Sequence, residues 1–513
     1  MKRTLFFLLL SCSAIVQVTS KPTTTWPDVF TKAKGKVVQI FSSGNDFDWF
    51  LPFRQGDESA GAGSGFIATK QGDIYTNYHV VDGSDIFKIQ HPDLWKEQFL
   101  AEFIGGSPEY DWAHLRLLPD ELERLIKMLP AGTLEYFDLG DSDGVVEGQE
   151  VMLIGYPKGE EDPKQVIGNI SGLQSNDTFG EVFTTTAPSN PGNSGGPAID
   201  MTGRVIGVVV GHRVDAVGIN HLIPINRLKV IMDELEDGKV IEHAFWGLHL
   251  VHTTPKTFEY LGSPVDAGVY VARVEKGSLA EQAGIMKGDI ISTINGLKVD
   301  RFAYVMLPWT KSKLLCFDVL ARIKNGTPAI FEVYRNGQLL NCSVTKTSGS
   351  SLKIKTHHLP FEQDPEFDVF GGMVFMELAL NHLQVLMGAI YNRVREGYFV
   401  SMDVIRLVSK FLDHDNQHES RLIITHLLPE SELAKNDVSI TNCLVKNVNG
   451  IQVHTLQDFQ KAVRDGVGTG YMVLETEGGT KVALLLKEIV AQEPKLAKKY
   501  RYNLSPLVKD LGF

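Results

Sequence analysis

The chain has 513 residues, of which 43% are hydrophobic and 22% are charged, and this length suffices for about three domains of typical size. Its formal net charge is -12. Because the chain has no long basic stripe to replace phosphate counterions, this composition argues against binding to a nucleic-acid backbone.

The first 20 residues have the pattern of a signal peptide. Lys2 and Arg3 precede an apolar run from Leu5 to Val18, and small and polar residues follow before Lys21. A membrane anchor is the less favoured alternative, because the uninterrupted apolar part is shorter than the roughly 20 residues that a spanning helix needs. We therefore expect an exported protein, either periplasmic or secreted.

The four cysteines are too few and too scattered to form a disulfide framework or a zinc site. Cys12 lies in the expected signal peptide, which leaves Cys316, Cys342 and Cys443. Three buried thiols are favoured over a single bridge between Cys316 and Cys342. No metal or cofactor is expected.

Residues 36–232 contain short β-rich runs separated by glycine turns, such as KVVQIF, GSGFIA, IYTNYHVV and GRVIGVVVG. Many short strands without a strong helical period before residue 226 predict a β-barrel or sandwich of about 200 residues. We assign residues 21–240 to this domain. Residues 244–348 differ, because strands there alternate with a short helix at residues 278–284, which predicts a compact α/β binding module.

Residues 349–368 are polar and contain Pro360 and Pro365, so they are expected to form a linker. After it, the chain repeats the order of the first module: a strand, an SELAK helix, a VKNVNGIQV hairpin, a QDFQKAV helix and a closing LLLKEIV strand. This order predicts a divergent second module over residues 369–490, with a helical insertion near residues 389–411. Residues 491–513 are expected to be a C-terminal tail.

His79, Asp111 and Ser194 are candidates for a catalytic triad. Ser194 lies in GNSGGP, where a tight turn can direct the backbone N–H groups of Gly192 and Ser194 inward as an oxyanion hole. A serine hydroxyl needs a positioned base, and His79 follows a β-run. Asp111 begins an apolar strand, where a buried carboxylate needs a partner such as the His79 imidazole. His114 is the nearest rival base, but it should face the other side of the strand.

The blocks GSGFIA, TNYHVV, DWAHLRL, GNISGL and TAPSNPGNSGGPAI resemble corresponding segments of HtrA/Deg serine proteases across residues 36–232. This resemblance implies a mainly β fold with a chymotrypsin-like double β-barrel. It also implies that His79 is the general base, Asp111 its orienting acid and Ser194 the nucleophile, with Gly192 and Ser194 as oxyanion donors. The order His, Asp, Ser is that of the chymotrypsin-type triad.

The expected substrate pocket has no acidic residue between Thr184 and Asn193, the stretch that should line its wall and base. Cleavage after Lys or Arg would require such a charge. We expect small or medium aliphatic residues at the cleaved position, with Ser189 and Ile219 as wall residues. The chain departs from the family pattern in reading GINHLIP where many members read GFAIP, and in having Trp112 after the acid.

The segment FWGLHL with the following GVYVARVEKGSLAEQAGIMKGDIISTING resembles a PDZ domain of the HtrA type. In such a domain an extended peptide pairs with the edge strand after Gly247, and loop N–H groups hold its terminal carboxylate. Trp246, Gly247 and Leu248 are the expected binding residues, and a purely structural PDZ-like module is the alternative. The second module is similar to a degenerate PDZ domain whose groove can be blocked, so it is assigned no binding residues.

The resemblance implies an ATP-independent endopeptidase that degrades misfolded or unfolded exported proteins and captures peptide C-termini at the first PDZ domain. It also implies a homo-oligomer, a trimer or a multiple of it, with Trp26 and Phe30 as candidate anchors. Two other functions stay open. The chain could be a holding chaperone or peptide-binding scaffold, or a regulatory protease with one signalling substrate.

Overall fold

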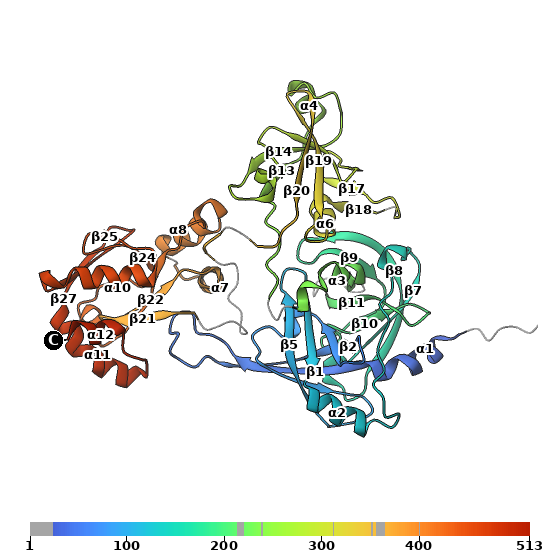
Figure 1. The fold of residues 1–513 in the computed structure, drawn as a ribbon, viewed down its shortest axis with the longest axis horizontal. Helices are drawn as coiled ribbons and strands as arrows, with labels where there is room; N and C mark the ends of the chain where they lie inside the picture. Colours follow the sequence, from blue (N-terminus) through green and yellow to red (C-terminus); the bar gives the residue numbers. More distant parts are fainter. Residues whose placement is uncertain are drawn as a thin grey trace, which may run out of the picture.

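The computed structural model describes residues 24–212, 220–236, 240–310, 312–349, 352–354, 365–399 and 401–512. The expected signal peptide, Ile219 and Phe513 lie outside these ranges. Two closed β-barrels are followed by two α/β modules (Figure 1), so the predicted fold class is confirmed. Within the described ranges, no helix is both long and apolar enough to cross a membrane.

The first barrel closes in the order β1-β2-β3-β6-β5-β4. Its strands are β1 (Val37–Asn45), β2 (Glu58–Ile67), β3 (Asp73–Thr76), β4 (Ile86–Gln90), β5 (Phe99–Ser107) and β6 (Trp112–Leu117). Helix α1 (Trp26–Ala33) precedes it, and α2 (Pro119–Met128) follows it. Trp26 and Phe30, the expected oligomer anchors, pack half-buried against the core between the two barrels.

The second barrel closes in the order β10-β11-β12-β9-β8-β7. Its strands are β7 (Glu150–Gly155), β8 (Lys164–Asn176), β9 (Gly180–Thr185), β10 (Pro197–Ile199), β11 (Val205–His212) and β12 (Asn220–Pro224), with helix α3 (Ile225–Ile231) after them. One apolar cluster joins the two barrels, with Phe66 and Trp112 from the first and Met152 and Val208 from the second. The barrels therefore share a core, and the segments that end at their junction are held firmly.

The first PDZ module is a sheet in the order β13-β14-β15-β19-β20. Its strands are β13 (Leu248–Val251), β14 (Val269–Val274), β15 (Ile290–Ile294), β16 (Leu297–Lys298), β19 (Pro328–Arg335) and β20 (Gln338–Thr345), beside a hairpin of β17 (Tyr304–Met306) and β18 (Lys313–Leu315). Its helices are α4 (Pro255–Tyr260), α5 (Leu279–Gln282) and α6 (Cys316–Ala321). Among the strands that the structure describes, β13 pairs only with β14, so its other edge has no strand partner there.

The second PDZ module has its strands in the order β21-β22-β23-β24-β26-β27. They are β21 (Phe367–Phe370), β22 (Met373–Glu377), β23 (Leu422–Leu427), β24 (Cys443–Val448), β26 (Tyr471–Thr476) and β27 (Lys481–Leu485), and β25 (Ile451–Gln452) pairs with β24. Its helices are α7 (Leu380–Arg395), α8 (Met402–Phe411), α9 (Glu432–Lys435), α10 (Leu456–Asp465), α11 (Leu486–Tyr500) and α12 (Pro506–Leu511). Strand β21 covers the edge of β22 that corresponds to the open edge of β13.

The C-terminal residues differ from the expected closing strand and tail. The LLLKEIV segment changes from strand to helix at Leu486, and α11 and α12 fold back on the module. Ile489, Leu507 and Leu511 lie in its apolar core. These residues bury apolar surface that a detached tail would expose to water. The hydrophobic effect therefore favours a C-terminal segment that packs on the module over one that extends into solvent.

Cys316 and Cys342 are buried and Cys443 is half-buried, and all three are free thiols. Burial raises the pKa of Cys316 to about 12, which keeps this thiol protonated and unreactive.

The loop of residues 46–57 between β1 and β2 leaves the first barrel and packs on the second PDZ module (Figure 1). The Trp49 ring lies 4.9 Å from that of His382, and the Phe53 ring lies 5.3 Å from that of Tyr502. Thr425 Oγ1 donates a hydrogen bond to the Phe50 carbonyl oxygen at 3.0 Å. Aromatic side chains of this loop thus pack against the second PDZ module and connect it to the first barrel.

Candidate active site

His79 and Asp111 meet on one side of the first barrel. His79 lies in the short helical turn after β3, and Asp111 lies in the turn before β6. The Nδ1 atom of His79 is 3.0 and 2.9 Å from the two carboxylate oxygens of Asp111. The backbone N–H of His79 also donates to Asp111 Oδ1 at 3.0 Å. The carboxylate therefore fixes both the ring and the backbone of the histidine, and it holds a proton on Nδ1 so that Nε2 is the basic nitrogen.

Asp111 is held in a backbone conformation that few residues adopt. Its φ is +53°, in the left-handed region, and its side chain is 9% exposed. The side-chain amide of Asn77 donates to the Asp111 carbonyl oxygen at 3.0 Å, and the N–H of Asp111 donates to the Pro108 carbonyl oxygen at 3.2 Å. These hydrogen bonds offset the strain and set the direction of the carboxylate.

Ser194 lies in the loop between β9 and β10, across the barrel junction from this pair. Its carbonyl oxygen accepts a hydrogen bond from the N–H of Ser64 on β2 at 2.9 Å. A Cβ atom placed on Gly63 would lie 2.7 Å from the side chain of Val80 and 3.3 Å from the Ser194 carbonyl oxygen. Because Val80 follows His79, the serine turn packs directly beside the histidine turn.

The backbone of this turn presents two N–H groups without partners. In the part of the chain that the structure describes, the N–H groups of Gly192 and Ser194 make no hydrogen bond, whereas that of Asn193 donates to the Asn190 carbonyl oxygen at 3.0 Å. Within the same ranges the Ser194 hydroxyl has no hydrogen-bond partner, and the His79 ring bonds only to Asp111. Uncommitted N–H groups beside a free hydroxyl form an arrangement that can bind a developing oxyanion.

Two residues that the sequence analysis did not single out support this site. Ser64 Oγ donates to the Gly192 carbonyl oxygen at 2.7 Å and accepts from the N–H of Tyr156 at 2.9 Å. It thereby fixes the peptide that follows Gly192. Asn77 orients Asp111, and its only sequence signal is its place two residues before His79 in TNYHVV.

The surroundings of His79 change its affinity for protons. Partial enclosure of the ring disfavours its charged form, but the hydrogen bond and charge of Asp111, together with the charge of Asp82, outweigh this effect. The pKa of His79 is therefore raised above its ordinary value. About half of the side chain, 48%, is exposed, so the ring can exchange protons with a bound molecule or with solvent.

His114 forms a separate pair, away from Asp111. Its Nε2 atom lies 3.0 Å from Asp73 Oδ1, and its ring stacks on Tyr75 with centroids 4.8 Å apart. The side chain is fully buried. Alternation along the strand predicts that His114 faces the opposite side from Asp111, and its pairing with Asp73 agrees with this prediction.

Ser189 lies half-buried in the loop that leads to Ser194, whereas Ile219 is outside the described residues. The side-chain amide of Asn220, which follows Ile219, donates to the Ala187 carbonyl oxygen at 2.8 Å. This bond joins the start of β12 to the loop of Ser189. His221, one of the departures from the family pattern, is buried in β12 between β9 and β11.

Trp246 and Gly247 form a loop before the open-edged strand β13, which begins at Leu248. The carbonyl oxygens of Trp246 and Gly247 accept from the N–H groups of Ala280 and Glu275 at 3.3 and 2.9 Å. In the described ranges, the N–H groups of Trp246 and Gly247 have no partner. The carbonyl oxygens of this loop thus bond to its own module, and its N–H groups are left to donate hydrogen bonds. Such a loop can bind the carboxylate of a peptide C-terminus.

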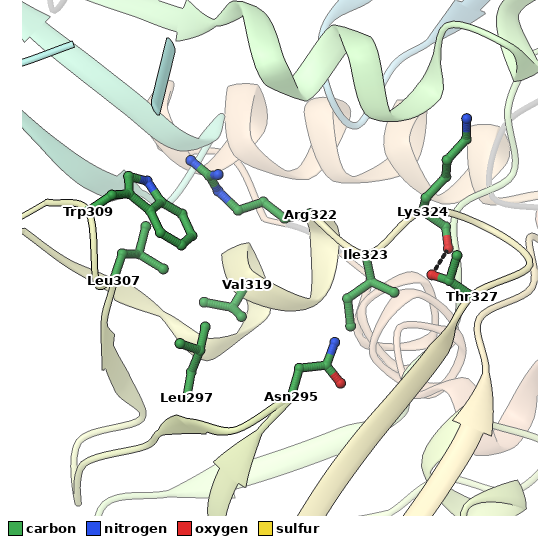
Figure 2. Close-up of a pocket in the computed structure, with 9 residues that line it drawn as sticks. All are labelled: Asn295, Leu297, Leu307, Trp309, Val319, Arg322, Ile323, Lys324 and Thr327. Atoms are coloured by element: carbon green, nitrogen blue, oxygen red, sulfur yellow. Dashed lines mark hydrogen bonds between the residues drawn. The ribbon is translucent and has the colours of Figure 1, made fainter. Parts of the chain in front are cut away.

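A cavity of about 370 Å³ lies elsewhere on the first PDZ module (Figure 2). Its nine lining residues include Leu307, Trp309 and Ile323, and none belongs to the loop of Trp246 to Leu248. Arg322, which lines it, donates to Asp143 at 2.8 Å and to Glu181 at 2.7 Å, the first in the segment before β7 and the second in β9. One residue that lines the cavity therefore also joins this module to the barrels.

Comparison with known proteins agrees with this architecture. Residues 63–208 match the model of a trypsin-like peptidase domain, and residues 234–306 and 355–504 match models of a PDZ domain. A Marinomonas protein named as a probable periplasmic serine endoprotease DegP-like is 29% identical over 372 residues, which cover 68% of this chain and 72% of the relative.

The serine protease Do-like HtrA of Bacillus subtilis is 30% identical over 265 residues, covering 48% of this chain and 56% of the relative. Among solved structures, a variant of the HtrA-type protease AlgW with a decapeptide has a TM-score of 0.50 and 25% identity. That alignment covers 63% of this chain and 98% of the other.

Proposed function

The chain is an HtrA-type serine endopeptidase with a trypsin-like peptidase domain and two PDZ domains, and from this premise we propose that it degrades unfolded exported proteins without ATP. The observation that carries the proposal is the hydrogen-bonded His79–Asp111 pair beside the Ser194 turn, in which two N–H groups have no partner among the described residues. Export is supported by the periplasmic names of several relatives.

In this proposal Ser194 Oγ attacks the scissile carbonyl carbon while His79 Nε2 takes the hydroxyl proton. Asp111 keeps the Nδ1 proton in place and stabilises the imidazolium that forms. The N–H groups of Gly192 and Ser194 donate to the developing oxyanion. His79 then gives its proton to the leaving amine, and water repeats the sequence on the acyl-enzyme.

We expect kcat/KM to rise with pH through a midpoint above about 6.5, the ordinary pKa of histidine, because only neutral His79 can act as the base and its pKa is raised. The measurement is a pH–rate profile with a small peptide whose chemical step is rate-limiting. Asp82→Asn should shift the midpoint to lower pH, since the charge of Asp82 favours protonated His79. A flat profile between about pH 5 and pH 8 would exclude histidine as the base.

The absence of acidic residues from Thr184 to Asn193 favours small or medium aliphatic side chains at the cleaved position, with Ser189 and Ile219 in the pocket wall. The first PDZ module would capture substrate C-termini by strand addition to β13, with the terminal carboxylate at Trp246, Gly247 and Leu248. A second anchoring site on the same molecule raises the effective concentration of a long chain at the active site.

We expect the enzyme, without nucleotide, to digest a reduced and unfolded secreted protein and to leave its native form largely intact. Gly247→Ala should raise the apparent KM for the unfolded chain several-fold, because the added Cβ would lie 2.3 Å from Ser278 Cβ and distort the loop. Gly372→Ala is the matched control, since its Cβ would lie 2.2 Å from Ser431 Cβ in the module whose strand edge β21 covers.

These variants separate capture from cleavage. A short peptide substrate without a free C-terminus should be cleaved at similar rates by wild type, Gly247→Ala and Gly372→Ala. Equal losses in the two variants would contradict peptide capture by the first module, and dependence on ATP would contradict the proposed function. We further propose a homo-oligomer, a trimer or a multiple of it, which light scattering would measure.

A further inference from the structure

The second PDZ module repeats the carboxylate-binding loop of the first. Gly372 corresponds to Gly247, because a Cβ on each would collide with the serine that N-caps a short helix of its module, Ser431 of α9 or Ser278 of α5. The carbonyl oxygen of Gly372 accepts from the N–H of Leu428 at 2.8 Å, as that of Gly247 accepts from Glu275 at 2.9 Å. Because both carbonyl oxygens bond to their own module, the N–H groups of the two loops are expected to point to the equivalent position in each module.

The two loops differ in what their N–H groups contact. The N–H of Gly372 donates to Glu493 Oε1 at 3.1 Å, and that of Gly371 also hydrogen-bonds the same carboxylate. Tyr502 Oη donates to Glu493 Oε2 at 2.8 Å. Glu493 comes from α11 and is fully buried. A carboxylate thus occupies the second loop, while the N–H groups of the first loop have no partner within the described residues.

The place of a peptide strand in the second module is occupied as well. Strand β21 pairs antiparallel with β22, with Val369 opposite Val374. Asp368 of β21 accepts hydrogen bonds from Gln460 of α10 at 2.8 Å and from Ser505 at 3.0 Å. Both parts of a PDZ ligand, an added strand and a carboxylate, are therefore supplied by the chain itself.

We infer that the second PDZ module binds parts of its own chain as an internal ligand, with β21 as the added strand and the Glu493 carboxylate of the C-terminal segment in the position where a PDZ domain holds a peptide's terminal carboxylate. The loop is a carboxylate receptor that is filled in cis, and it takes no peptide from solution. The first module is then the receptor that stays open to substrates. Burial raises the pKa of Glu493 to about 7, although Tyr502 and the loop N–H groups favour the charged form, so the carboxylate predominates at pH 8.

The test is chemical rescue of Glu493→Ala with acetate at pH 8, in the full chain. The variant should lower the melting midpoint of this module, and acetate should raise it again by about 2 °C or more at matched ionic strength. Acetamide, the neutral analogue, should raise it less. Glu488→Ala, an exposed position on the same helix, is the matched control and should respond to acetate no more than wild type. Equal effects of acetate and acetamide on Glu493→Ala would overturn the inference.

A second variant covers the case in which Glu493→Ala does not fold. Glu493→Gln keeps an acceptor oxygen of the same shape but loses the charge, and a neutral amide oxygen accepts more weakly than a carboxylate. Amide hydrogen exchange at Gly372, followed at pH 8, should quicken several-fold, whereas exchange in β23 and β24 should not change. Unchanged exchange at Gly372 would show that the carboxylate is not the ligand of the loop.

Discussion

Ser194→Ala should lower kcat for an unfolded protein by about 10⁶-fold, because it removes the proposed nucleophile from the turn that presents the uncommitted N–H groups of Gly192 and Ser194 in the described ranges. The purified variant should keep its melting temperature, since the Ser194 hydroxyl makes no hydrogen bond in those ranges. An active-site phosphonate should label the wild-type enzyme at Ser194 and leave the variant unlabelled, as mass spectrometry of the digested protein would show.

Ser189→Ala is the matched control for this prediction, because Ser189 lies in the same loop and is half-buried. If it lines the pocket wall as proposed, its substitution should change kcat/KM by less than about tenfold and leave phosphonate labelling intact. The Ser194→Ala protein also separates the competing functions, since a holding chaperone would still delay aggregation without the hydroxyl. Digestion by Ser194→Ala at the wild-type rate would remove Ser194 from the mechanism.

The sequence was most informative where function depends on a short local pattern. GNSGGP specifies a tight turn, and a histidine or an acid at the end of an apolar run needs a polar partner, so Ser194, His79 and Asp111 could be proposed without contacts. The alternation of faces in a strand also assigned His114 to a different partner.

The supporting residues were missed because their roles depend on packing between distant segments. Ser64 reaches the carbonyl of Gly192 only when the two barrels close against each other. The aromatic loop at residues 46–57 likewise meets the second PDZ module through contacts that no local pattern encodes. Such contacts arise from packing between segments far apart in the chain rather than from local secondary-structure propensity.

The C-terminal segment was misjudged for a different reason. LLLKEIV is a short apolar run that suits a buried strand as well as a helix, and periodicity alone does not separate the two. Pro494 within α11 further weakens the helical signal. The helix forms because Leu486, Ile489 and Leu496 are buried on one side of it.

Asp111→Asn should lower kcat by about 10⁴-fold while leaving most of the fold intact. The asparagine oxygen can keep the bond from the backbone N–H of His79, which places the side-chain NH₂ opposite Nδ1. An NH₂ group donates, so Nδ1 must then accept and the ring proton moves to Nε2. A protonated Nε2 cannot take the proton of Ser194. Stopped-flow or long-time assays of acylation would measure the loss.

Asp73→Asn supplies the matched control, because it changes the other buried aspartate that pairs with a histidine. Burial of Asp73 opposes its charge, but hydrogen bonds from His114, Thr69 and Arg116 hold the pKa of this carboxyl well below its usual range. Its stabilisation is present above the unfolded pKa of about 3.9 and is lost as the pH falls below it. At pH 7 Asp73→Asn should therefore lower the free energy of unfolding by about 3 kcal/mol and leave kcat nearly unchanged. If Asp111→Asn instead lost activity only in proportion to stability, Asp111 would be structural, and the assignment of His79 as the base would fail with it.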